Sequence, residues 1–255
     1  MNELIVTPLG TVSPYCFKKF NCSGYLVLYQ NQRYLLDAGN GISRYLQMPG
    51  ILTNLKILIT HLHPDHFEEL SVLCQSALVY KRLGMLKTDL EVYIPGGDYI
   101  NNKHSIEYEF IHSLENNYPV KVIDYDNINI QNKDLEITSL RVPHQVVANA
   151  FRIDTSIGSI VYSGDTGSEN DLRKFAQGAD LFICESTYLD GQPRLDNTHL
   201  YAREAGMIAR DAHVKNLLLT HFWPHIAKEN YVKEAKNYFE NTSYAEEGKK
   251  LVLKR

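Results

Sequence analysis

Short apolar runs bounded by polar, Gly and Pro residues recur along the whole chain. Runs of this kind predict β-strands rather than helices, because they are short and end at turn residues. The tripeptide Gln30-Asn31-Gln32 joins two of them and predicts a hairpin. The predicted strands span residues 4–6, 24–29, 33–37, 56–59, 90–94, 121–125, 135–142, 150–153, 159–162, 181–184, 215–220 and 250–253.

Helical periodicity appears between these runs. The clearest case is residues 198–212, where Ala202, Ala205, Ile208 and Ala209 fall on one face. Other predicted helices span residues 42–47, 67–83, 172–175 and 230–239, together with part of 98–118. Strands come first and are then interleaved with helices, twice over. This order predicts one α/β domain over residues 1–255, with two packed sheets and helices outside.

Composition supports a globular chain with a sizeable core. Hydrophobic residues make up 44% and charged residues 22% of the 255 positions. The net charge of −4 argues against a general nucleic-acid-binding surface. The four cysteines form no CxxC pair, so we expect no disulfide and a reducing compartment. The chain shows no signal-peptide pattern and no bilayer-length apolar run, so we expect no membrane partner and a cytoplasmic location.

The chemistry concentrates in residues 60–66, Thr-His-Leu-His-Pro-Asp-His, directly after a predicted strand. His61, His63 and Asp65 lie at i, i+2 and i+4, and His66 is offset by one. Imidazole and carboxylate are ligands for divalent transition metals, and this spacing predicts two neighbouring metal sites. A histidine-rich surface loop is one alternative. A structural zinc site is another, although such sites mostly use cysteine and no Cys pair lies nearby.

Three further candidate ligands also follow predicted strands. His144 follows the strand ending at Val142, Asp165 follows the one ending at Tyr162, and His221 follows residues 215–220. Each alone fits a solvated loop residue. Agreement at four strand ends instead favours a shared metal site.

With these residues the chain resembles the metallo-β-lactamase superfamily, in particular its dinuclear phosphodiesterase branch. That branch includes RNase Z, the PhnP-like cyclic phosphodiesterases and the phage anti-Pycsar proteins. The resemblance runs from the first strand to about residue 226, and it implies a four-layer αββα sandwich with two mixed sheets face to face. The motifs that carry it are THLHPDH (60–66), PH (143–144), YSGDT (162–166) and LLLTHF (217–222), supported by LLDAG (35–39), CEST (184–187) and THLYAREAG (198–206).

The resemblance implies roles for these residues. One metal is held by His61, His63 and His144, the other by Asp65, His66 and His221, and Asp165 bridges the two. We expect two divalent ions, zinc first and manganese or iron as alternatives, with a bridging hydroxide as nucleophile. The catalytic residues are Asp65, His199 as general acid and Glu185, which orients His199. Asp37 supports the metal loop through hydrogen bonds, and His225 receives no role.

Two differences from family members restrict the class of substrate that we expect. Members that process tRNA carry a long arm between the strands ending in the single His ligand and the bridging Asp. Here only 21 residues separate His144 from Asp165, and two strands and a turn use all of them. The Asp at position 165 also favours phosphodiesterases over lactamases, glyoxalases and sulfur dioxygenases.

We therefore expect hydrolysis of a small phosphodiester, first a 3′,5′-cyclic mononucleotide that serves as an immune or signalling molecule. RNase Z-like cleavage of RNA, hydrolysis of a 2′,3′-cyclic phosphate and a non-catalytic metal-binding scaffold are the alternatives. The branch also implies a homodimer, with residues 98–118 as the candidate contact and His104 and His112 at the surface. The Asn-, Lys- and Tyr-rich composition suits a low-GC bacterium or its phage, and a phage protein would act in the host cytoplasm.

Overall fold

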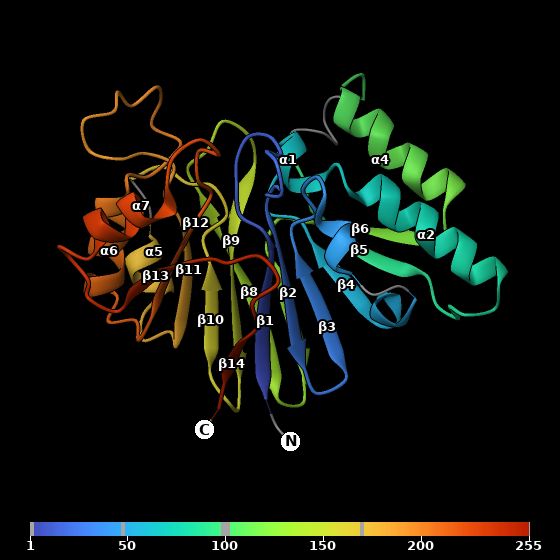
Figure 1. Cartoon of the computed structure of the whole chain (residues 1–255). Coiled ribbons are helices and arrows are strands. Elements are labelled where there is room, and N and C mark those ends of the chain that lie inside the picture. Colours follow the sequence, from blue (N-terminus) through green and yellow to red (C-terminus); the bar gives the residue numbers. More distant parts are fainter. Residues whose placement is uncertain (1–2, 47–48, 98–102, 169–170, 255) are drawn as a thin grey trace.

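The computed structural model describes residues 3–46, 49–97, 103–168 and 171–254. They form two sheets of seven strands each, stacked face to face, with helices on both outer faces (Figure 1). The predicted α/β sandwich is confirmed. The strands are β1 (Leu4–Gly10), β2 (Gly24–Tyr29), β3 (Gln32–Leu36), β4 (Leu55–Leu58), β5 (Leu90–Pro95), β6 (Val120–Tyr125), β7 (Asn129–Asn132), β8 (Leu135–Val142), β9 (Ala148–Thr155), β10 (Ser159–Tyr162), β11 (Leu181–Glu185), β12 (Leu217–Thr220), β13 (Thr242–Tyr244) and β14 (Leu251–Leu253).

Both sheets are built in the same way, as the repeated order of elements predicts. The first has the order β14-β1-β2-β3-β4-β5-β6 and the second β13-β12-β11-β10-β9-β8-β7. In the first sheet the pairs from β14 to β3 are antiparallel and those from β3 to β6 are parallel. The second sheet is antiparallel from β7 to β10 and parallel from β10 to β13.

Three apolar layers hold the sandwich together. Between the sheets, large side chains such as Tyr25, Tyr34 and Phe151 are fully buried. Two further layers lie between each sheet and its helices. Removal of this apolar surface from water is the main favourable contribution to folding. On the first sheet the helices are α2 (Leu70–Arg82) and α4 (Ile106–Asn117), and on the second α5 (Leu172–Phe175), α6 (Ala202–Asp211) and α7 (Lys228–Ala235) (Figure 1).

Several predicted boundaries were wrong. The helix over 67–83 is two helices, α1 (Pro64–Phe67) and α2, because Pro64 starts a short helix within the histidine motif. The residues predicted as helix 42–47 form a 3₁₀ helix only at Ile42–Tyr45, and a second 3₁₀ helix at Gly50–Leu52 was not predicted. Residues 47 and 48 lie outside the described residues. Strands β7 and β13 were missed because they are short, polar and at sheet edges.

The strands that precede the candidate ligands end at one edge of the sandwich. Strands β8, β10, β11 and β12 run in the same direction, since β9 is antiparallel to both β8 and β10 and the rest pair in parallel. Helix α1 lies at this end, opposite the two chain termini (Figure 1). Within the described ranges, no helix combines the length and apolar character needed to cross a bilayer.

Candidate metal centre

The structure brings all seven predicted ligands together. The ligand atoms of His61, His63, His144 and Asp165 form one group, and those of Asp65, His66 and His221 form a second. Within each group the atoms lie within 4.8 Å of one another. These two groups correspond to the two ligand sets that the family resemblance implies, and a third group, Asp165, His199 and His221, overlaps both of them.

One nitrogen of each buried ring is held from outside the cluster. The Nδ1 atoms of His61, His66 and His221 lie 2.9, 2.7 and 2.8 Å from Thr60 Oγ1, Asp37 Oδ2 and Thr187 Oγ1. The Nδ1 of His144 lies 3.1 Å from the carbonyl oxygen of Thr198. Because these oxygens accept, the proton of each neutral ring is on Nδ1 and the Nε2 lone pair faces the cluster.

The inward nitrogens of these rings lie close to one another. His63 Nδ1 lies 3.2 Å from His61 Nε2 and 3.0 Å from His144 Nε2. In the second group, His66 Nε2 and His221 Nε2 are 3.4 Å apart. Lone pairs at these separations repel unless a proton or a metal cation lies among them. This arrangement fits a pair of metal ions, with His63 presenting Nδ1 and the other four rings Nε2.

Asp165 lies between the two groups. Its Oδ2 is 3.6 Å from His61 Nε2 and 3.0 Å from His221 Nε2, and its Oδ1 is 3.4 Å from His66 Nε2. The Oδ1 atom is buried and has no hydrogen-bond partner. A buried carboxylate oxygen without a donor is costly, so its position also fits a cation.

The buried carboxylates around the cluster also require nearby positive charge. Asp37, Asp65, Asp165 and Glu185 are all buried. Within the described part of the chain, their ion pairs involve only histidines and no Lys or Arg. Burial opposes the charged form of His221, yet the Asp165 carboxylate raises the pKa of His221 to about 10. The cluster thus favours positive charge, which protons or divalent cations supply.

Asp37 ties the metal loop to both sheets. Its carboxylate accepts hydrogen bonds from Thr60 N, Thr60 Oγ1 and Tyr162 OH, and it lies 2.7 Å from His66 Nδ1. The residue follows β3 in a left-handed conformation, with φ of 60°, and His221 after β12 has φ of 62°. Non-Gly residues adopt this region rarely and at an energetic cost, and they often do so at functional sites.

His199 and Glu185 form a pair beside Asp165. His199 Nδ1 lies 3.0 Å from Glu185 Oε1 and 3.9 Å from Asp165 Oδ2. Its ring stacks on His221, with centroids 5.3 Å apart. Helix α6 begins only at Ala202, so His199 precedes the helix that was predicted to contain it. Burial lowers the pKa of His199, but the Glu185 carboxylate outweighs this effect and the net shift is upward.

Glu185 is fixed by its own hydrogen bonds. It accepts from the backbone N–H groups of Thr166, Thr187 and Leu200 and from Thr187 Oγ1. A carboxylate held in this way can orient a neighbouring imidazole. Thr187, which contacts both Glu185 and His221, lies in the CEST motif but was given no role from the sequence.

Sequence reasoning also missed Ser13, whose Oγ donates to Asp65 Oδ2 over 2.8 Å. No motif marks this residue, because its loop is positioned by pairing with Phe222 far along the chain.

His225 is exposed and outside both groups. Within the 98–118 segment, Ile106–Asn117 form helix α4, and its Phe110 packs against Phe67 of α1. Residues 98–102 lie outside the described residues.

Comparison with known proteins identifies one matching family and several relatives. The model of the beta-lactamase superfamily domain matches residues 32–222. The uncharacterized protein Rv1339 of Mycobacterium tuberculosis is 30% identical over 94% of this chain and 88% of its own length. A ribonuclease Z of Clostridium kluyveri is 28% identical over 87% of this chain and 89% of its own. The crystal structure of the metallo-beta-lactamase fold protein YhfI from Bacillus subtilis superposes with a TM-score of 0.87 and 25% identity, over 98% of this chain and all of YhfI.

Proposed function

The chain belongs to the beta-lactamase superfamily, and on that premise we propose that it is a metal-dependent phosphodiesterase that hydrolyses a cyclic nucleotide. The observation that carries the proposal is the double cluster, with Asp165 between its two groups and the His199–Glu185 pair beside it. Relatives named ribonuclease Z and probable metallo-hydrolase support hydrolysis of phosphoesters.

We assign the first metal to His61, His63 and His144, the second to Asp65, His66 and His221, and the bridging position to Asp165. Zinc suits these imidazole and carboxylate ligands. Two such ions, when bound, make water a nucleophile at neutral pH and offset negative charge on the phosphoryl oxygens. Asp65 serves catalysis through the position it gives the second ion, and Ser13 fixes the orientation of its carboxylate.

His199 acts as the general acid. Its Nδ1 is hydrogen-bonded to Glu185, so its Nε2 is the atom that carries a proton to the leaving oxygen. The upward pKa shift of His199 keeps more of the ring protonated near neutral pH. Glu185 holds the ring in this orientation and stabilises its charge.

A small substrate is favoured over tRNA by the connection between His144 and Asp165. It consists of β9 and β10 joined by a short turn at residues 156–158, which leaves no chain for an arm. RNase Z-like cleavage of RNA is the alternative, supported by the ribonuclease Z relatives. Residues 1–255 act as one domain in this proposal, supported by the pairing of β14 with β1.

The decisive experiment is a substrate panel with the purified, metal-loaded protein. It contains 3′,5′- and 2′,3′-cyclic mononucleotides, bis-p-nitrophenyl phosphate and precursor tRNA. We expect the 3′,5′-cyclic mononucleotides to give the highest kcat/KM. Preferential cleavage of precursor tRNA would establish the RNase Z alternative. Fewer than about one metal per chain, together with no turnover, would overturn the proposal of a metal-dependent enzyme.

We also propose a homodimer in which α4 forms part of the contact. Ile106, at the start of α4, is 84% exposed and is therefore accessible to a second copy of the chain. Sedimentation of the wild type and of Ile106→Lys tests this. The variant is expected to be monomeric at concentrations where the wild type is dimeric.

A further inference from the structure

Two of the four cysteines are in direct contact. The Sγ atoms of Cys16 and Cys22 lie 3.8 Å apart, and both residues are free thiols. Cys16 is exposed, whereas Cys22 is fully buried. The other two cysteines, Cys74 and Cys184, are buried in the two separate layers between the sheets and their helices. An exposed thiol thus touches a buried one within a single loop.

The loop holds the two cysteines together through a short hairpin. Phe17 and Phe20 exchange two backbone hydrogen bonds, of 3.1 and 2.9 Å, and so close the turn between them. Cys16 therefore lies beside Cys22 although five residues separate them in the sequence. A disulfide needs sulfur atoms about 2 Å apart, so the two Sγ atoms have to approach each other by about 1.8 Å.

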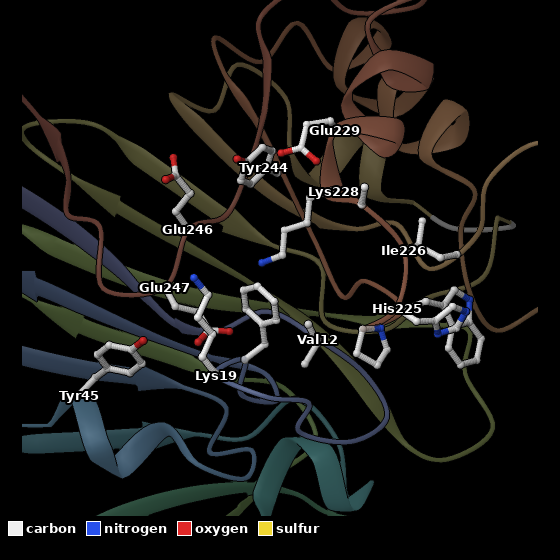
Figure 2. Close-up of a pocket in the computed structure, with 14 residues that line it drawn as sticks. Val12, Lys19, Tyr45, His225, Ile226, Lys228, Glu229, Tyr244, Glu246 and Glu247 are labelled. Atoms are coloured by element: carbon white, nitrogen blue, oxygen red, sulfur yellow. The ribbon is translucent and has the colours of Figure 1, made fainter.

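Cys22 is the fixed member of this pair. Its backbone N–H donates to the carbonyl oxygen of Asn40, and the residue pairs with Val12. The thiol of Cys16 donates to the same carbonyl oxygen over 2.9 Å. Val12 and Lys19, from the same loop, border a cavity of about 600 Å³ (Figure 2). Because the loop faces solvent and this cavity, Cys16 is the member that can move.

Movement of Cys16 reaches the metal centre through Ser13. The hydroxyl of Ser13 donates to Asp65 Oδ2 over 2.8 Å, and only two residues separate Ser13 from Cys16. A disulfide draws Cys16 away from the carbonyl oxygen of Asn40 and shifts this short segment. The Ser13 hydroxyl then loses its alignment with Asp65. Hydrogen bonds of this kind orient metal ligands, and their loss weakens metal binding.

We propose that Cys16 and Cys22 form an oxidative modification site, at which a peroxide converts the two thiols into a disulfide and thereby weakens the metal group of Asp65. The Cys16 sulfur first attacks the O–O bond, becomes a sulfenic acid and releases one water. The Cys22 sulfur then displaces the second oxygen as water, and the S–S bond forms. The two thiols lose two electrons and two protons, and one hydrogen peroxide becomes two waters.

Exposure and burial decide the order of these steps. The oxidant reaches the exposed Cys16 first, and burial raises the pKa of the Cys22 thiol, which stays protonated. The sulfenic acid forms in contact with Cys22, and this proximity offsets the low reactivity of a protonated thiol. In a reducing compartment small thiols attack the exposed sulfur and restore the pair. The inference rests on the proposed metal centre but not on its substrate.

The test uses zinc-loaded protein, since zinc has no redox chemistry of its own. After treatment with hydrogen peroxide and blocking of free thiols, trypsin cleaves at Lys18 and Lys19, between the two cysteines. We expect the peptides 1–18 and 20–33 to remain joined until dithiothreitol separates them. Competition with a chelator should show that the oxidised protein binds one of its two zinc ions at least about tenfold more weakly. Reduction, followed by removal of the reductant, should restore the affinity.

Three variants serve as controls. Cys16→Ser cannot form the bond and should keep the same zinc affinity before and after peroxide. Cys74→Ala, which removes a buried thiol outside the pair, should respond as the wild type does. Ser13→Ala should already bind zinc as weakly as the oxidised wild type, and oxidation should weaken it no further, because its hydrogen bond to Asp65 is gone.

Three results would overturn the proposal. One is oxidation of Cys16 to a sulfinic acid without joined peptides. Another is formation of the disulfide with an unchanged zinc affinity. The third is an equal loss of zinc affinity in Cys16→Ser, which would place the oxidative damage elsewhere. Absence of phosphodiesterase turnover with intact zinc binding contradicts the proposed function alone, because neither readout uses a substrate.

Discussion

Asp37 Oδ2 lies 2.7 Å from His66 Nδ1, and both side chains are fully buried. The same carboxylate also accepts from Thr60 and Tyr162, so three donors converge on Oδ2. In Asp37→Asn, only one of the two terminal side-chain atoms can accept a hydrogen bond. At least one buried donor therefore loses its partner. We expect metal affinity to fall about 10- to 100-fold and the free energy of unfolding to fall by about 1–3 kcal/mol.

Metal titration against a competing chelator and urea unfolding measure these two effects. The control is Asp126→Asn, an exposed turn residue, which should change neither. Unchanged metal affinity in Asp37→Asn would mean that His66 is oriented without Asp37.

The role of His199 predicts a dependence on the leaving group. In His199→Ala, hydrolysis of a cyclic nucleotide should slow about 10²- to 10⁴-fold, because its alkoxide leaving oxygen needs a proton. Hydrolysis of bis-p-nitrophenyl phosphate should slow much less, because p-nitrophenolate leaves without one. Glu185→Gln should show the same ordering with smaller losses.

Metal content, measured on the same samples, should stay at the wild-type level. His213→Asn is the control, since His213 is exposed after α6 and its φ of 51° tolerates asparagine. Equal losses with both substrates, together with loss of metal, would identify His199 as a ligand instead of the acid.

Gly39 allows the turn after β3 to pack directly against the metal loop. A Cβ at this position would lie 2.1 Å from the carbonyl oxygen of Asp65 and 2.8 Å from Cys22 Cβ. Gly39→Ala must therefore displace the Asp65 backbone, and we expect weaker binding of one of two metals and a lower melting temperature. Gly50→Ala, where a Cβ meets nothing within 4 Å, is the matched control. A wild-type metal content in Gly39→Ala would contradict this packing argument.

Removal of the metals should destabilise the fold as well as stop turnover. Four carboxylates are buried around the site without a Lys or Arg partner among the described residues. A metal present at about 100 times its Kd contributes about 2.7 kcal/mol. Calorimetric melting with and without chelator measures the loss, and added zinc should restore both stability and activity. A melting temperature that chelation leaves unchanged would exclude tight metal binding.

The positions of the candidate ligands could be predicted because topology brings strand ends together. His144, Asp165 and His221 each follow an apolar run, and parallel pairing places the ends of β10, β11 and β12 at one edge. The ring nitrogen that each histidine presents could not be predicted. It depends on outside acceptors such as Thr60 and Thr187, whose positions are set by the folded chain.

Residues in irregular segments were also beyond prediction. Ser13 contacts Asp65 only because Val12 pairs with Phe222 across a long sequence separation, and no local periodicity encodes this pairing. Likewise, the start of α6 was placed too early, since Tyr201 is extended and caps the helix together with Glu204. There the side chain of His199 bonds to Glu185 before the helix begins.

Lys228 should make stability depend on alkaline pH. Burial lowers its pKa from 10.5 to about 8 in the folded chain. Between these values the unfolded chain binds more protons than the folded chain, so this group's contribution to the free energy of unfolding rises with pH. The difference between 10.5 and about 8 corresponds to a penalty of about 3 kcal/mol near neutral pH. Lys228→Met should therefore be more stable than the wild type at about pH 7, and this advantage should disappear above about pH 10. Urea unfolding across this range measures the difference, with Lys236→Met expected to follow the wild type. An advantage of Lys228→Met that does not change with pH would show that the ammonium is fully solvated in the folded chain.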